Sequence, residues 1–231
     1  RRPGRRRRLI RRARVALARI TVLVSGRGSN LGALLAAERA GSFAGSVTQV
    51  VSNRPKAGGL AIARDHGVAT TVVDHTAYAD RDRFDDALAA AIDAGEPDLV
   101  VLAGFMRVLG RRFVDRYAGR LINIHPSLLP SYPGLHTHRR ALADGVKLHG
   151  CTVHFVTADV DVGPIIAQAA LGVRDDDDED SLAGRVLALE HRLLPACVGW
   201  FCDGRLVIEN GRVRVVEAGD AGDIVSPPVR R

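Results

Sequence analysis

Short apolar runs alternate with longer helix-like segments over the first half of the chain, and this alternation constrains the fold more than any other feature. The runs are rich in Val, Ile and Leu, while the segments between them carry apolar residues at helical spacing. Strands that alternate with helices form βαβ units, and strands without polar alternation lie in a parallel sheet covered on both faces. The sequence therefore predicts an α/β fold with a Rossmann-like, doubly wound, mostly parallel sheet, whose first five strands lie at residues 20–25, 47–52, 69–73, 98–103 and 120–124.

The pattern changes in the second half of the chain. Two further strands are expected at residues 152–156 and 164–171, and the turn-rich residues between them predict an antiparallel C-terminal hairpin addition to the sheet. An acidic run precedes Ser181, which is expected to cap a long helix whose positive dipole end the acids stabilise. A small terminal hairpin is expected around Asn210-Gly211.

Basic residues are concentrated at the N-terminus. The 231 residues include 33 Lys and Arg against 26 Asp and Glu, a formal charge of +7 that points first to a nucleic-acid or anionic-membrane partner. Residues 1–19 hold ten of the arginines and no acid, so the remaining body carries about −3. We therefore expect a disordered arm at residues 1–19, one domain at residues 20–216 and a poorly ordered tail at residues 217–231.

Composition excludes several classes of protein. Hydrophobic residues make up 46% of the chain, enough for an ordinary core, and no apolar run approaches the roughly 18 residues that cross a bilayer. The arm lacks the uninterrupted apolar stretch of a secretory signal. Cys151, Cys197 and Cys202 form no CxxC motif, which argues against a disulfide framework and structural zinc. A cytoplasmic protein is expected.

A glycine loop, Gly26-Arg27-Gly28-Ser29-Asn30, joins the first strand to the first helix. Glycines let the backbone approach a ligand, and the helix directs free N–H groups and its positive dipole end at that point, which suits a phosphate. The loop is not a dinucleotide fingerprint, because Leu31 occupies the third glycine position. From this loop alone, a phosphate site and a plain tight turn both remain open.

Asn123 and His125 end the fifth predicted strand. Residues two apart on a strand project to the same face, so both side chains are expected at the carboxyl edge of the sheet, where open α/β folds bind ligands. An amide donor beside an imidazole suits oxyanion stabilisation with proton transfer, and a structural histidine is the alternative. Asp161 is either a turn aspartate or a carboxylate that favours the charged imidazole. His136 and His138 lack a carboxylate that would complete a metal site, so no metal is expected.

Five segments of the chain carry a family resemblance. They read SGRGSNL at residues 25–31, LAGFMRVL at 102–109, NIHPSLLPSYPGLHTHR at 123–139, VHFV at 153–156 and DVGP at 161–164. Together they resemble the phosphoribosylglycinamide formyltransferases (glycinamide ribonucleotide transformylases), a folate-dependent formyltransferase family. The resemblance runs from about residue 20 to about residue 206, and residues 123–139 are its most specific part.

The resemblance implies formyl transfer from 10-formyltetrahydrofolate to the amino group of glycinamide ribonucleotide, a step of de novo purine synthesis that gives N-formylglycinamide ribonucleotide and tetrahydrofolate. It implies no metal and no nicotinamide. Asn123, His125 and Asp161 match the catalytic trio. Residues that match ribonucleotide contacts are Gly28, Ser29, Asn30 and Glu190. Residues that match folate contacts are Arg81, with Arg83 as the competing choice, Met106, Arg107, Val108, Leu109, Asn123, Thr157, Ala158, Asp159, Val160 and Asp161.

Three other functions fit parts of the sequence. A formyltetrahydrofolate hydrolase shares the Asn-x-His and Asp elements but is expected to carry a further N-terminal domain, and a methionyl-tRNA formyltransferase is expected to carry a C-terminal RNA-binding domain. A nucleic-acid-binding protein would act through the arginine-rich arm. The segment PGLHTH favours the transformylase reading, with small-molecule substrates, no nucleic-acid or membrane partner, and a monomer or homodimer.

Overall fold

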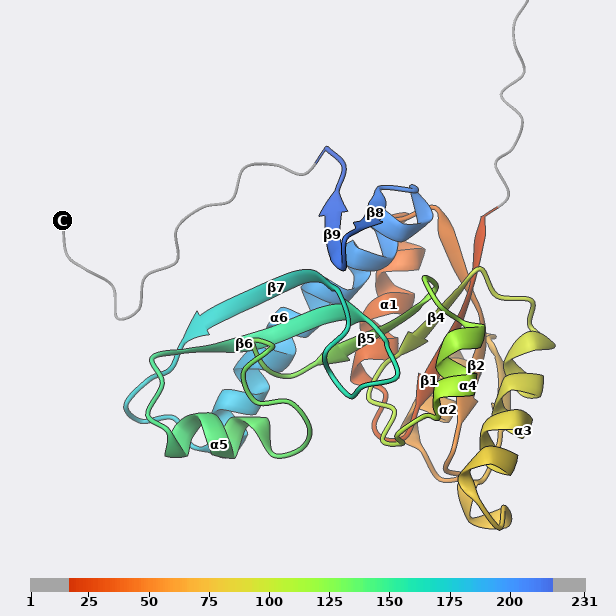
Figure 1. The fold of residues 1–231 in the computed structure, drawn as a ribbon, viewed down its shortest axis with the longest axis horizontal. Coiled ribbons are helices and arrows are strands. Elements are labelled where there is room, and N and C mark those ends of the chain that lie inside the picture. The colour runs from red at the N-terminus through yellow and green to blue at the C-terminus, as the bar shows by residue number, and fades with distance from the viewer. Residues whose placement is uncertain (1–16, 218–231) are drawn as a thin grey trace, which may run out of the picture.

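The computed structural model of the protein describes residues 17–217 (Figure 1). Most of the predicted arm and tail, residues 1–16 and 218–231, lies outside the described residues. The strands are β1 (Ala18–Val24), β2 (Gly45–Ser52), β3 (Ala69–Val72), β4 (Leu99–Leu102), β5 (Leu121–His125), β6 (Leu148–Phe155), β7 (Ile165–Gly172), β8 (Leu206–Glu209) and β9 (Arg212–Val215). The helices are α1 (Ser29–Arg39), α2 (Gly58–Asp65), a 3-10 turn (His75–Ala77), α3 (Arg81–Asp93), α4 (Arg111–Arg116), α5 (Thr137–Ala143) and α6 (Glu179–Cys202).

Seven of these strands form one sheet in the order β3-β2-β1-β4-β5-β6-β7. The first five in sequence pair with one another in parallel, β6 is antiparallel to β5, and β7 is antiparallel to β6. This confirms the predicted doubly wound, mostly parallel sheet with an antiparallel addition. β8 and β9 form the predicted separate hairpin, whose turn residues Asn210 and Gly211 have φ of 51° and 72°.

Helices cover both faces of the sheet (Figure 1). Val22 and Val24 of β1 belong to the core that packs under α1, α2 and α6, whereas Leu23 belongs to the core under α3 and α4. Because successive side chains of a strand point to opposite faces, a strand buried on both sides is mostly apolar. The apolar run that predicted β1 has this cause, and its one fully buried polar residue, Thr21, donates its hydroxyl to Oε1 of Gln49 over 3.1 Å.

Two boundaries differ from the sequence-based predictions. The predicted cap of α6 at Ser181 was wrong: Asp178 is the N-cap, and its side chain accepts the N–H of Ser181 over 2.8 Å. The hydroxyl of Ser181 in turn accepts the N–H of Asp178 over 2.9 Å, which completes a capping box. β6 begins at Leu148, four residues before its predicted start, because Gly150 interrupts the apolar pattern without interrupting the pairing with β7.

No helix within residues 17–217 combines the length and the apolar character needed to cross a membrane.

Candidate active site

The carboxyl ends of β1, β4 and β5 lie at one edge of the sheet, because these strands are parallel neighbours. The glycine loop (residues 26–30) follows β1, and residues 103–110, here called the β4 loop, follow β4. Asn123 and His125 close β5. The strand order reverses between β1 and β4, and ligands of open α/β sheets bind beside such a switch point.

His125 has an oxygen acceptor beside each ring nitrogen. Nδ1 lies 3.5 Å from Oδ2 of Asp161, and Nε2 lies 3.0 Å from the carbonyl oxygen of Tyr132. The side chains of His125 and Asp161 are 8% and 11% exposed, so bulk water screens this pair little. When protonated, an imidazole donates through both nitrogens, and this arrangement gives each donor a partner.

A histidine on the neighbouring strand holds the amide of Asn123. β5 and β6 pair Asn123 with His154, and Nδ2 of Asn123 donates to Nε2 of His154 over 3.2 Å. Nδ1 of His154 lies 2.9 Å from the carbonyl oxygen of Phe155, which assigns the proton to Nδ1 and the lone pair to Nε2. Burial lowers the pKa of His154, which keeps this tautomer neutral. The second Nδ2 proton of Asn123 is then available to a ligand.

Residues 157–163, between β6 and β7, bring Asp161 to His125. Asp161 has a φ of 57°, in the left-handed region that few residues other than glycine adopt. Its Oδ2 also accepts the N–H of Gly134 over 2.8 Å, so the carboxylate is fixed from a second loop. The sequence left open whether Asp161 is a turn residue or a partner of the imidazole. In the structure Asp161 lies in a turn and also beside the imidazole of His125.

The glycine loop presents backbone donors at the start of α1. Gly28 is the N-cap with a φ of 81°, and no side chain of residues 17–217 caps this helix. A Cβ at Gly28 would lie 2.4 Å from Cα of Gly59, so the crossing of α1 and α2 also requires glycine here. The N–H groups of the first turn are therefore oriented for an anion.

Asn30 and Glu190 meet behind the glycine loop. Nδ2 of Asn30 donates to Oε2 of Glu190 over 2.7 Å, although the two residues are 160 positions apart in the sequence. Burial raises the pKa of Glu190, and the bond from Asn30 opposes that shift. Within the described residues, Oδ1 of Asn30 is buried and has no hydrogen-bond partner. The pair therefore keeps polar capacity for a ligand.

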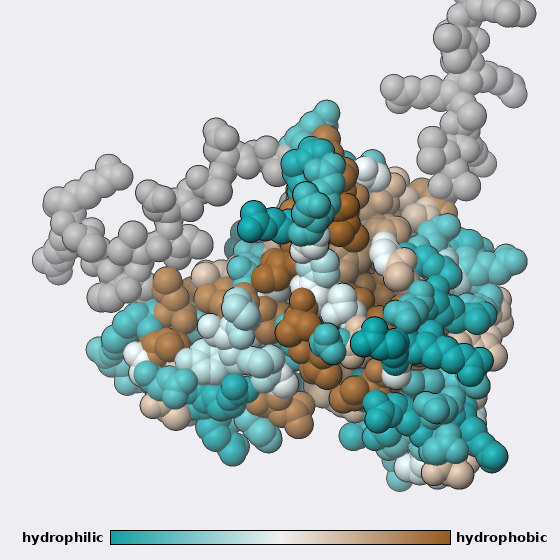
Figure 2. All heavy atoms as spheres, in the orientation of Figure 1, coloured by the Kyte–Doolittle hydropathy of each residue, from teal (hydrophilic) through white to brown (hydrophobic). Residues whose placement is uncertain are grey.

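Three loops around the trio carry exposed apolar side chains. The β4 loop exposes Met106 and Val108, residues 126–136 expose Leu135, and residues 157–163 expose Val160 and Val162. Figure 2 shows apolar residues in the middle of the visible face, between polar margins. Such a surface beside convergent polar groups is typical of a site for a small organic ligand.

The two arginines predicted as alternatives for a folate contact lie in the first turn of α3. Arg83 forms an exposed ion pair with Asp80, with 3.6 Å between Nε and Oδ2. Arg81 opens the helix and is exposed. Both arginines are exposed, so the choice of Arg81 over Arg83 stays a prediction.

The remaining candidates contribute no further site. Nδ1 of His138 lies 3.1 Å from Nε2 of His149, and His136 precedes α5 with a φ of 56°. Among residues 17–217, no group of three or more His, Cys, Asp or Glu side chains is arranged to hold a metal ion. Cys151 is fully buried, and burial raises the pKa of its thiol to about 12, which makes it a poor nucleophile.

Sequence reasoning gave no role to His154 or Ser25. Ser25 directly follows β1, and its hydroxyl accepts the N–H of Met106 over 2.7 Å and donates to Oδ1 of Asn53 over 2.6 Å. The sequence did hold a signal for His154: it lies in the predicted strand that becomes β6, and in the structure it pairs directly with Asn123 of β5. Ser25 gave none, because Met106 is 81 positions away in the sequence.

Comparisons with known proteins agree on one family. A model described as formyl transferase matches residues 18–198. The chain is 51% identical over 187 residues to phosphoribosylglycinamide formyltransferase of Escherichia coli (strain K12), covering 81% of this chain and 88% of that protein. Other relatives are trifunctional purine biosynthetic proteins, of which the chain matches at most 20% of the length.

Solved structures give the same picture. Glycinamide ribonucleotide transformylase 1 from Symbiobacterium toebii superposes with a TM-score of 0.86 at 49% identity, covering 88% of this chain and 96% of that one. A formyltetrahydrofolate deformylase from Pseudomonas syringae pv. tomato superposes with a TM-score of 0.81 at 25% identity, covering 88% of this chain and 67% of that one.

Proposed function

The chain belongs to the formyl transferase family, and we propose that it transfers the formyl group of 10-formyltetrahydrofolate to the amino group of glycinamide ribonucleotide. The products are N-formylglycinamide ribonucleotide and tetrahydrofolate, and the reaction is a step of de novo purine synthesis. The observation that carries this function is the convergence of Asn123, His125 and Asp161 at the carboxyl edge of the sheet, in a chain 51% identical to a phosphoribosylglycinamide formyltransferase.

The loops around the trio fit a folate. When bound, 10-formyltetrahydrofolate supplies the formyl carbon and the nitrogen that leaves from it. Exposed apolar side chains such as Met106, Val108 and Val160 offer a surface to its ring system, and exposed Arg81 offers a charge to its carboxylates. We assign the folate to these residues together with Arg107, Leu109, Asn123 and the rest of residues 157–161.

The glycine loop and α6 fit the ribonucleotide. Backbone N–H groups at Gly28, Ser29 and Asn30 would hold its phosphate, where the positive end of α1 favours an anion. Glu190 would accept a donor of the ribonucleotide through Oε1, since Oε2 already accepts from Asn30. In this proposed arrangement the amine of the substrate lies on the β1 side of the site and the folate lies over the β4 loop.

The trio stabilises charge that develops on the formyl oxygen. The neutral amine forms a bond to the formyl carbon, and the formyl oxygen becomes an oxyanion. Asn123 donates its second Nδ2 proton to that oxygen, and His125 donates from Nε2 once the substrate replaces the Tyr132 carbonyl as its acceptor. Asp161, 3.5 Å from Nδ1, keeps the ring oriented and balances its positive charge.

The proton balance closes within the same reaction. As the oxyanion collapses, the bond between the formyl carbon and the folate nitrogen breaks, the attacking amine loses one proton and the leaving nitrogen gains one. A chain of water molecules at the site would carry this proton. His125 keeps its own proton at the end of the cycle, so the enzyme returns to its starting state.

Amine dependence of turnover tests this function. Purified protein is given 10-formyltetrahydrofolate with and without glycinamide ribonucleotide, and formation of tetrahydrofolate is followed. The expected result is turnover only when the amine is present. Absence of turnover with both substrates would contradict the proposal.

Hydrolysis of 10-formyltetrahydrofolate is the second candidate function, and the superposition with a formyltetrahydrofolate deformylase at a TM-score of 0.81 favours it. The lower identity to that protein, 25% against 51% for the transferase, places it second. Equal turnover with and without the amine would establish it. We further propose a cytoplasmic location. We also propose a monomer or homodimer, and size-exclusion chromatography with light scattering measures that oligomeric state.

A further inference from the structure

Asp85 is a carboxylate in an apolar layer. It lies on the core-facing side of α3 between Phe84 and Leu88 and is 6% exposed. Burying a carboxylate costs free energy unless hydrogen bonds compensate it. Because α3 has exposed positions for acids on its other side, the burial of Asp85 calls for a specific partner.

That partner is the last residue of the β4 loop. Oδ2 of Asp85 accepts the N–H of Gly110 over 2.7 Å, and Gly110 is the N-cap of α4. A Cβ built at Gly110 would lie 2.9 Å from the same oxygen, so a side chain here would displace the carboxylate of Asp85. The φ of Gly110 is −71°, which any residue adopts, so a side chain at this position conflicts with the contact and not with the backbone.

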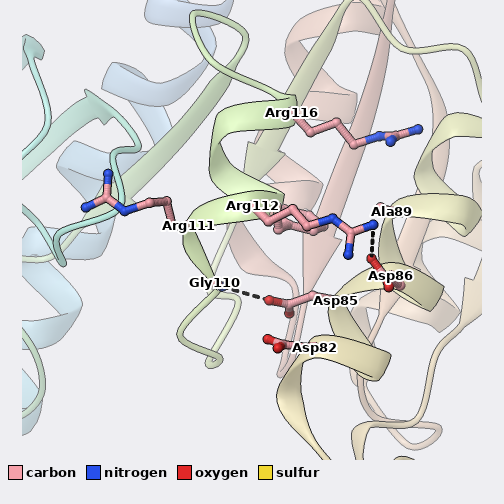
Figure 3. A pocket seen from close by; sticks show the side chains of 9 residues that line it. Asp82, Asp85, Asp86, Ala89, Gly110, Arg111, Arg112 and Arg116 are labelled. Atoms are coloured by element: carbon pink, nitrogen blue, oxygen red, sulfur yellow. Dashed lines mark hydrogen bonds and ion pairs between the residues drawn. The ribbon is translucent and has the colours of Figure 1, made fainter.

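Asp85 forms no ion pair with an arginine of residues 17–217, although the charge of nearby Arg81 partly opposes the rise in its pKa that burial causes. A cavity of about 140 Å³ separates α3 from α4, and in Figure 3 Arg112 extends across it to Asp86 while Asp85 faces the backbone of Gly110. The distance from Nη2 of Arg112 to Oδ1 of Asp86 is 3.3 Å. Within residues 17–217, Oδ1 of Asp85 is buried without a hydrogen-bond partner. The contact with Gly110 is therefore the main polar interaction of this carboxylate.

The β4 loop is thus fastened at both ends. At its start, Ser25 donates its N–H to the carbonyl oxygen of Gly104 over 3.1 Å and accepts the N–H of Met106 over 2.7 Å. At its end, Asp85 holds Gly110. Between these points Met106 and Val108 are more than half exposed. These two contacts hold both ends of the loop that carries Met106 and Val108.

We propose that Asp85 is a positioning residue: it fixes the end of the β4 loop in the conformation that binds the folate, and so sets folate affinity without touching the substrate. The inference rests on the proposed function, because it takes the β4 loop as part of the folate site. A purely structural role for Asp85 would instead affect the folate and the ribonucleotide alike, through loss of folded protein.

Steady-state kinetics on the full chain separate these roles. Asp85→Ala removes the acceptor, Asp85→Asn keeps an oxygen that can accept the N–H of Gly110, and Gly110→Ala breaks the contact from the other side. Asp86→Ala is the matched control, since Asp86 lines the same cavity but pairs with Arg112. KM for each substrate, kcat and the thermal midpoint are measured for all four.

The expected result is specific to the folate. Asp85→Ala and Gly110→Ala raise KM for 10-formyltetrahydrofolate by about 10- to 100-fold, the scale of a lost hydrogen bond to a charged group, and change KM for glycinamide ribonucleotide less than about twofold. Asp85→Asn recovers most of the affinity, and Asp86→Ala behaves as wild type. In the double variant Asp85→Ala/Gly110→Ala, KM for the folate rises by less than the product of the two single increases.

Three outcomes would overturn the inference. The first is a folded Asp85→Ala variant with the wild-type KM for the folate. The second is an equal rise of both KM values together with a lower thermal midpoint. The third is wild-type protein that neither transfers the formyl group nor binds 10-formyltetrahydrofolate by calorimetry, which would also remove the proposed function. In the first two outcomes the proposed function stands.

Discussion

His125 and His154 stand on neighbouring strands and act in opposite ways, because their ring nitrogens face different partners. His125 has oxygen acceptors on both sides, so it can serve as a donor. His154 uses one nitrogen as donor to Phe155 and the other as acceptor from Asn123, and its lowered pKa keeps it neutral. At the scale of single residues, hydrogen-bond partners determine which ring nitrogens can donate a hydrogen bond to a ligand and which only orient a neighbour.

Loss of either proposed oxyanion donor is expected to lower the rate of formyl transfer without unfolding the protein. Asn123→Ala and His125→Ala should each lower kcat by about 10²- to 10³-fold, the usual effect of removing one such donor. His66→Ala is the control, because His66 is exposed at the end of α2. Single-turnover rates check the prediction, and a variant with the wild-type rate and a wild-type thermal midpoint would remove that residue from the mechanism.

Glu190 is expected to lower the stability of the fold while it contributes to substrate binding. Its pKa is raised by burial, so the unfolded chain releases this proton at a lower pH than the folded one, and the stability of the fold falls as pH rises from about 4.5 through the folded pKa. Glu190→Gln removes this loss. Its thermal midpoint should exceed that of wild type more at about pH 8 than near pH 4.

The same variant should bind glycinamide ribonucleotide about tenfold more weakly, since a charged acceptor is lost. Differential scanning calorimetry at both pH values and KM for the ribonucleotide check the two parts. A midpoint difference that does not change with pH would show that the carboxylate is not destabilised by burial.

At the scale of elements, α6 shows how an acidic run acts at a helix start. Asp178 caps the helix and Ser181 closes the capping box, while Asp177 bonds the N–H of Arg174 and pairs with Arg185. Glu190 lies on this helix, so the capped start helps to set the position of a residue of the proposed ribonucleotide site. Acids that look alike in sequence therefore differ in their structural effect.

Asp178→Ala is expected to lower the thermal midpoint by about 2–4 °C, the effect of a lost helix cap in a domain of this size. Asp176→Ala is the matched control, because Asp176 is exposed in the same run and caps nothing in the described chain. Thermal unfolding followed by circular dichroism measures both. Equal shifts for the two variants would mean that net charge, and not capping, accounts for the effect.

Local patterns predicted most elements and only part of the site. The strands β1 to β5 were found within two residues of their predicted bounds, because strands buried on both faces leave an apolar run in the sequence. Asn123 and His125 were placed on one face by the period of a strand. The contact of His125 with Asp161 and that of Asn30 with Glu190 depend on how distant segments pack, which no local pattern encodes.

At the scale of the whole molecule, one rigid sheet gathers loops from distant parts of the chain. Ser25 ties the start of the glycine loop to the β4 loop, and Asn30 ties it to α6. The two proposed substrate sites therefore share one framework. The body outside the first 19 residues carries a formal charge of about −3, so the net charge does not attract the proposed phosphate. The positive potential at that site comes instead from the start of α1.

Removal of residues 1–16 is expected to leave formyl transfer unchanged within about twofold, since every residue assigned to the site lies within residues 17–217. Affinity for duplex DNA, if present, should depend steeply on salt and disappear with the same deletion. Kinetics and fluorescence anisotropy on both forms check this. Loss of turnover on truncation would place part of the site in the first 16 residues.

The fate of the formyl carbon tests the central claim most directly. The protein is incubated with glycinamide ribonucleotide and 10-formyltetrahydrofolate labelled with ¹³C in the formyl group, and the products are identified by NMR. The account predicts that the label appears as the N-formyl group of the ribonucleotide, one for each tetrahydrofolate formed. Label recovered as free formate, or retained on the folate, would contradict it.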